Sequence, residues 1–136
     1  MEKYVFDTSA WLALIEDESG ADTVQKILER TETEEVQVFV SFMSFMEVYY
    51  ITLQERDRVE AETRINLIKS LPVNRVESTP SINKTAAKLK ASYHMSVADA
   101  WIAALAKEIQ AILVHKDPEF EQVENEIQTL KLPYKV

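Results

Sequence analysis

The stretch Tyr4-Val5-Phe6-Asp7-Thr8-Ser9-Ala10 carries the pattern on which the fold of this chain depends. Three apolar, β-prone residues come first, and an aspartate with two hydroxyl residues follows, as is typical of the point where a helix begins. A strand that passes directly into a helix is the repeating unit of α/β folds. We therefore expect a first strand over residues 4–6 and a helix from about Ala10.

The same alternation continues along the chain. Further strands are expected where apolar and β-branched residues cluster, at residues 36–40, 75–77, 111–114 and 128–132. Helices are expected between them, at about residues 21–30, 42–53, 57–70, 82–93 and 97–107. No linker rich in Pro, Gly or Ser divides the 136 residues, so we expect one domain, 1–136, with an α/β fold and a mainly parallel sheet.

Composition narrows the classes of function. The absence of cysteine excludes disulfides and thiolate metal sites, and it suits a reducing cytoplasm. The single glycine, Gly20, excludes a phosphate-binding loop and a dinucleotide-binding turn, which need several glycines. No apolar run approaches the roughly 20 residues that cross a bilayer. Asp7 interrupts the short apolar stretch at the N-terminus, so we expect a cytoplasmic protein with no signal peptide and no membrane contact.

Charge is distributed unevenly. The net charge of −8 argues against a nucleic-acid partner, but residues 56–95 contain 8 Lys and Arg against 4 Asp and Glu. A polyanion could meet this basic segment, although solvated helix faces would explain it equally well. The candidate phosphate contacts in it are Arg56, Arg58, Lys84 and Lys88.

Four carboxylates stand where a parallel sheet would bring them together. Asp7 follows the first expected strand, and Asp117 lies just past the fourth. Ligands of open parallel sheets bind outside the carboxyl ends of the strands, so these two acids would face one crevice if their strands are neighbours. Glu47 and Asp99 are expected in the first turns of two helices, Glu47 after the second strand, and helices that follow strands start at the same edge.

Such a cluster is typical of a site for Mg²⁺ or Mn²⁺. Four carboxylates without a cation would repel one another, and some would have to take up protons. Both ions prefer oxygen ligands and retain several waters. They can generate a hydroxide nucleophile, hold a phosphate oxygen and stabilise a leaving oxygen, which are the needs of phosphodiester hydrolysis.

Each acid also has a purely structural explanation. Glu47 lies three residues after Ser44. Asp99 stands at the same distance from Ser96, the expected N-cap of its helix, so both acids could complete capping boxes. The other two acids could begin a helix or a turn. The recurrence of strand, acid, hydroxyl residue and helix at one edge favours the metal site.

Other chemistries have weaker support. His94 and His115 could form an acid–base pair that acts on RNA without metal, but packing explains both more simply. Ser9 could be a nucleophile, yet no residue is marked as the base that would activate it.

Two expected helices carry more apolar positions than one core-facing stripe requires. The surplus could close a homodimer or receive a partner helix, unless both helices are covered on two sides within the monomer. The residues are Trp11, Leu12 and Ile15, and Phe42, Phe45, Tyr49, Tyr50 and Leu53.

Four stretches resemble, in order, the motifs of PIN domains. They are the opening Val5–Ala10, the segment Ser41–Glu47 that ends in a helical acid, the Asp-Ala helix in Ser96–Ala106, and the closing Ile112–Phe120. The likeness spans nearly the whole chain, and the last two stretches are the most specific. At this length the chain is most similar to the VapC toxins of bacterial and archaeal toxin–antitoxin pairs.

This resemblance implies a three-layer α/β/α fold with a five-stranded sheet in the order 3-2-1-4-5. It also implies a Mg²⁺- or Mn²⁺-dependent endoribonuclease that hydrolyses RNA as a toxin, forms a homodimer and binds a VapB-like antitoxin. Matched by position, the four acids of the family fall on Asp7, Glu47, Asp99 and Asp117, and its supporting hydroxyl residue on Ser9.

The chain departs from the family pattern at two places. His115 replaces the usual Thr or Ser near the last acid, and Gln110 replaces a common Gly before the fourth strand. One alternative is a non-catalytic PIN-like module that binds RNA or protein, which a metal site disturbed by His115 would favour. Another is a Mg²⁺-dependent phosphatase on a different α/β fold. The phosphatase would usually have a second Asp where Ser9 stands.

Overall fold

The computed structural model describes residues 1–135 and contains one parallel sheet in which every strand follows the same direction. Its order is β3-β2-β1-β4-β5, as the resemblance implied. The strands are β1 (Glu2–Phe6), β2 (Val36–Ser41), β3 (Asn74–Val76), β4 (Ile112–His115) and β5 (Thr129–Lys131). The five expected strands are confirmed, with ends that differ by one or two residues.

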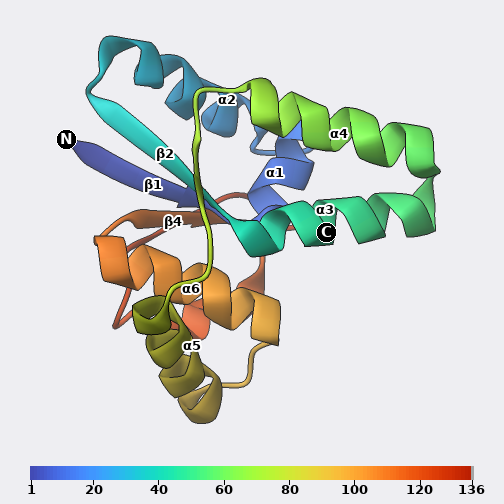
Figure 1. Ribbon diagram of the computed structural model, residues 1–136. Coiled ribbons are helices and arrows are strands. Elements are labelled where there is room, and N and C mark those ends of the chain that lie inside the picture. Colours follow the sequence, from blue (N-terminus) through green and yellow to red (C-terminus); the bar gives the residue numbers. More distant parts are fainter. Residues whose placement is uncertain (136) are drawn as a thin grey trace.

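Helices cover both faces of the sheet and make it the middle of three layers (Figure 1). The bounds are α1 (Thr8–Ile15), α2 (Ala21–Arg30), α3 (Phe42–Glu55), α4 (Arg58–Ser70), α5 (Pro80–Ser92) and α6 (Val97–Ile109). Short 3₁₀ segments lie at η1 (Thr31–Thr33) and η2 (Pro118–Val123). Figure 1 shows α3 and α4 as a hairpin on one side and α5 and α6 as a pair on the other.

Alternate side chains of the central strands supply a core on each face. Phe6 packs with α1–α4, whereas Val5 packs with α5, α6 and η2, and neither side chain is exposed. Strands covered on both sides read as continuous apolar runs, which explains the pattern at residues 4–6 and 111–114.

The carboxyl edge of the sheet is where the helices of the candidate site begin. Asp7 caps α1 by accepting a hydrogen bond from the Ser9 N–H, and Ser41 caps α3 by accepting one from the Met43 N–H. Ser96 caps α6 through the Asp99 N–H, as expected.

The capping box proposed for Ser44 and Glu47 is wrong. Because Ser41 ends β2 and caps α3, Ser44 lies inside the helix with no exposed surface. Glu47 therefore stands in the second turn of α3 rather than the first, and its carboxylate is not needed at the helix end.

Strands β1 and β4 are hydrogen-bonded neighbours, with Phe6 opposite Val114. The Asp7 N–H donates to the Val114 carbonyl at 2.9 Å, which carries the pairing one residue past β1. The condition for bringing Asp7 and Asp117 to one crevice is thereby met. No helix within residues 1–135 is both long and apolar enough to cross a membrane.

Candidate metal centre

Three carboxylates form the compact part of the site. Oxygen atoms of Asp99, Asp117 and Glu119 all lie within 4.8 Å of one another. Asp99 comes from the first turn of α6, and the other two come from the turn after β4 and the start of η2. Asp99 is buried, Asp117 is half-buried and Glu119 is exposed, so the group opens from the core to solvent.

Asp7 is near this group, because its charge acts on Asp99, and it is only 2% exposed. Its Oδ2 accepts hydrogen bonds from the Ser9 N–H at 3.0 Å and from the Ser9 hydroxyl at 2.5 Å. Its Oδ1 is buried and has no hydrogen-bond partner within residues 1–135. A buried carboxylate oxygen without a donor is costly, and a divalent cation is the kind of partner that would satisfy it.

Glu47 reaches the site from α3. The Thr8 hydroxyl donates to Glu47 Oε1 at 2.7 Å and lies 3.0 Å from the Ser44 hydroxyl. These contacts join the first residue of α1 to the second turn of α3. They hold Glu47 near Asp117, whose charge acts on it.

Ser9 connects two of the acid-bearing segments. Its hydroxyl oxygen accepts the backbone N–H of Lys116 at 2.8 Å while its proton is directed at Asp7. One hydroxyl therefore connects the Asp7 side chain to the turn that carries Asp117, which is an arrangement that suits the supporting role expected of Ser9.

Burial and mutual repulsion make these acids hard to ionise. Burial raises the pKa of Asp7 to about 7, and the charges of Glu47 and Asp117 add to this against the hydrogen bonds from Ser9. Burial raises the pKa of Asp99 to about 9, together with the charge of Asp7 and a hydrogen bond with Glu119. The free cluster holds protons that a cation would displace.

The pKa values of Glu47 and His115 shift in opposite directions. Burial raises the pKa of Glu47, which the Thr8 hydroxyl partly counteracts. Burial lowers the pKa of His115, against the charge of Asp117. Both shifts favour the neutral form, as expected where the protein excludes water.

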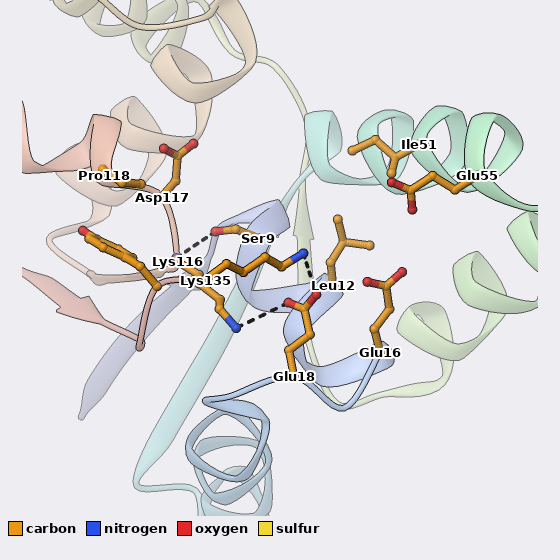
Figure 2. Close-up of a pocket in the computed structure, with 11 residues that line it drawn as sticks. Ser9, Leu12, Glu16, Glu18, Ile51, Glu55, Lys116, Asp117, Pro118 and Lys135 are labelled. Atoms are coloured by element: carbon orange, nitrogen blue, oxygen red, sulfur yellow. Dashed lines mark hydrogen bonds and ion pairs between the residues drawn. The ribbon is translucent and has the colours of Figure 1, made fainter.

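A cavity of about 350 Å³ adjoins the cluster and shares Ser9 and Asp117 with it (Figure 2). Three acids, Glu16, Glu18 and Glu55, line its far side. Lys116 and Lys135 both pair with Glu18, at 3.5 Å and 2.8 Å. Both lysines of this cavity are therefore already engaged by the same carboxylate, that of Glu18.

The candidate phosphate contacts do not form one surface. Arg56 and Arg58 lie at the junction of α3 and α4, at the end of the hairpin remote from the sheet (Figure 1). Lys84 and Lys88 are exposed on α5, which covers the opposite face. Their role in binding RNA stays a prediction for two separate regions.

Sequence reasoning missed Glu119 and Thr8. Glu119 follows Asp117 at a distance of two residues, and this spacing of acids in a turn was an available signal. Thr8 had no comparable signal, because its partner Glu47 is 39 residues away along the chain. His94 and His115 do not form a pair: His94 is exposed, and His115 is buried against Phe120.

Solved structures with a similar fold include a toxin and several toxin–antitoxin complexes. VapBC2 from Rickettsia felis, bound to a DNA fragment from its promoter, has a TM-score of 0.77 at 14% identity and covers 96% of this chain and 99% of its own. VapC20 from Mycobacterium tuberculosis, a toxin that cleaves the sarcin–ricin loop, has a TM-score of 0.70 at 16% identity, with coverages of 88% and 94%. A toxin–antitoxin complex from Klebsiella pneumoniae has a TM-score of 0.66 at 18% identity, with coverages of 98% and 99%.

At such low identity these likenesses establish the fold alone. None of the curated proteins matches the sequence significantly. The sequence model of the PIN domain, however, matches residues 4–126, which is most of the chain. The sheet order of the chain and the acids at the carboxyl edge of its sheet agree with this match. The chain belongs to the PIN-domain family.

Proposed function

We propose that this protein is a Mg²⁺- or Mn²⁺-dependent endoribonuclease that hydrolyses RNA phosphodiester bonds. The observation that carries the proposal is that carboxylates from three other segments lie near a buried Asp7 whose Oδ1 has no donor among residues 1–135. Helix capping accounts for one oxygen of Asp7 but not for the other.

The position of each residue in the site determines its proposed role. Asp7, Asp99, Asp117 and Glu119 would hold the cation, with Glu47 closing the site from α3. When bound, a divalent cation would supply Lewis-acid stabilisation of the charge on the phosphodiester. Ser9 orients Asp7 by donating to it, and the half-buried rim at Asp117 leaves room for a substrate phosphate.

A phosphatase is less well supported. Its usual second acid would stand at Ser9, whose hydroxyl is engaged by Asp7 and by the Lys116 N–H. The family membership also favours a nuclease. The non-catalytic alternative remains an outcome of the experiment below.

We further propose that the enzyme is the toxin of a VapBC-type pair. The support is the fold shared with toxins solved in VapBC and other toxin–antitoxin complexes. A VapB-like antitoxin would then be its protein partner. The acids around the cavity beside Asp117 suit a basic segment of that partner, which would block access of RNA.

A homodimer is proposed on the surface of α3. Met46, Tyr50 and Leu53 are 50%, 41% and 43% exposed, which is unusual for one helix face of a monomer. The expectation that Trp11 also supplies a partner surface is wrong, because its side chain lies fully inside the core with Phe6.

The test is RNA cleavage with and without Mg²⁺ or Mn²⁺, compared with hydrolysis of a small phosphomonoester. Asp7→Asn and Asp99→Asn should each reduce RNA cleavage by at least about 100-fold while the protein stays folded, since each removes a charged ligand and keeps the side-chain shape. Asp22→Asn, at an exposed position in the first turn of α2, is the matched control.

Three results would contradict the proposal. Cleavage of the phosphomonoester but not of RNA would indicate a phosphatase. Metal-independent RNA binding without cleavage would indicate the non-catalytic module. Near wild-type cleavage by Asp99→Asn would remove Asp99 from the metal centre.

Glu119 has a test of its own. Glu119→Gln should weaken Mn²⁺ binding roughly tenfold with little loss of thermal stability, because its side chain is exposed and its ligand atom belongs to the three-acid group. Glu124→Gln, an exposed acid at the end of η2, is the control. Unchanged Mn²⁺ affinity in Glu119→Gln would remove Glu119 from the site.

A further inference from the structure

His115 occupies an unusual place beside the metal centre. It is the last residue of β4, it has no exposed surface, and its Nδ1 accepts the backbone N–H of Asp117 at 3.2 Å. The preceding N–H, that of Lys116, donates to the Ser9 hydroxyl at 2.8 Å. Both N–H groups of the turn after β4 are thus held by side-chain acceptors.

The ring of His115 is fixed on two sides by aromatic residues. The ring centroids of Phe120 and Tyr134 lie 5.2 Å and 6.3 Å from that of His115. These contacts limit the positions open to the imidazole. In the orientation that the structure shows, Nδ1 accepts the Asp117 N–H, and a flipped ring would present a C–H there instead.

The other ring nitrogen, Nε2, makes no hydrogen bond among the described residues that would stabilise the fold. An accepting Nδ1 places the ring proton on Nε2, which is buried and has no partner within residues 1–135. A buried N–H without an acceptor costs stability, so an apolar side chain would serve packing at least as well. The contribution specific to histidine is the acceptor that Nδ1 presents to the turn.

We propose that His115 is a positioning residue for the metal centre: by accepting the Asp117 N–H it fixes the turn so that the Asp117 carboxylate faces Asp99 and Glu119. Side chains that orient a metal ligand commonly change metal affinity by about 10- to 100-fold when removed. This inference rests on the proposed metal centre, and it assigns to His115 the fine placement of one ligand.

Two substitutions of equal size separate the acceptor from packing. His115→Asn keeps an oxygen at the place of Nδ1, whereas His115→Leu has the same branching and no acceptor. Both remove the far half of the ring, so both should have similar thermal midpoints in EDTA. His115→Leu should bind Mn²⁺ at least about tenfold more weakly than His115→Asn, measured by the electron paramagnetic resonance signal of free Mn²⁺.

A measurement on the wild-type protein supports the comparison. Long-range ¹H–¹⁵N spectra of imidazoles distinguish the two neutral tautomers, and the only other histidine, His94, is exposed and easily assigned. His115 should carry its proton on Nε2 in the metal-free protein. This measurement needs neither metal nor a folded variant.

The outcomes separate this inference from the proposed function. Equal Mn²⁺ affinities of His115→Asn and His115→Leu, with a wild type that binds Mn²⁺, would overturn the positioning role alone. A proton on Nδ1 in the wild type would overturn it as well. A wild type that binds no Mn²⁺ would overturn the metal centre, and the role of His115 with it.

Discussion

Replacing Asp7 by Asn should stabilise the metal-free protein at alkaline pH. Burial raises the pKa of Asp7 from 3.8 to about 7, so the folded state holds a proton that the unfolded state releases over this range. Stability of the wild type must therefore fall as pH rises through this window, and the loss is complete above about pH 7. Asn carries no charge and avoids this loss.

The size of the effect follows from the shift. A difference of about 3 pH units corresponds to about 4 kcal/mol at 1.36 kcal/mol per unit, of which about 3 kcal/mol develops between pH 5 and pH 8. Asn can still accept the hydrogen bonds that Ser9 donates, and its amide can donate toward the neighbouring carboxylates. We expect Asp7→Asn to exceed the wild type by about 2 to 4 kcal/mol at pH 8 in EDTA, with a smaller difference at pH 5.

The assay is thermal or urea unfolding in EDTA at several pH values, repeated with Mg²⁺. One kcal/mol corresponds to roughly 3 to 5 °C in a chain of this size. Mg²⁺ should raise the midpoint of the wild type and leave Asp7→Asn unchanged, because binding to the folded state alone stabilises it. A variant that is less stable than the wild type at pH 8 in EDTA would refute the reasoning, since the capping bonds of the Asp7 carboxylate would then outweigh the cost of its buried charge.

The remaining predictions concern the surface and one helix end. Replacing Lys84 and Lys88 by Gln should lower the slope of log RNA affinity against log salt concentration by about one unit for each phosphate that is no longer neutralised. The control Lys26→Gln, on the exposed side of α2, should leave the slope unchanged. Equal slopes for the α5 variant and the wild type would exclude α5 from the RNA-binding surface. Tyr50→Glu should convert a dimer to a monomer in solution scattering, and a monomeric wild type would leave the α3 surface without a role. Gln110→Gly should raise the free energy of unfolding by about 1 kcal/mol, because φ at this helix end is +56°; a loss of stability would show that the Gln side chain contributes more than the strain costs.

Much of the fold could be predicted from the sequence because the preferences that determine strands and helix starts act between residues close in the chain. Apolar runs at residues 4–6 and 111–114 indicate strands covered on both faces, and Ser96 marks a helix start through a bond to its own third neighbour. Acids placed directly after such strands must lie at the carboxyl edge of a parallel sheet. Asp7 and Asp117 could be assigned to one site on that ground alone.

Local patterns were less reliable where two elements meet. The serines at 41 and 44 are both acceptable caps, and only the length of β2 decides for Ser41. Gln110 adopts the left-handed conformation that favours Gly because the chain must leave α6 and enter β4 at once. The tight connection from α6 to β4 requires this strained conformation, and no Gly marks its position in the sequence.

The order of residues along the chain was enough to predict the α/β alternation and the carboxyl edge of the sheet, and to select the four acids of the candidate site. Three features emerged only from the folded arrangement: which oxygens come together, that Glu119 joins them, and that Thr8 and Ser9 brace Glu47 and the Asp117 turn. The difference lies in the range of the interactions. Strand and cap preferences act over a few residues, whereas burial, charge repulsion and side-chain hydrogen bonds join segments up to 107 residues apart and exist only after the sheet has formed.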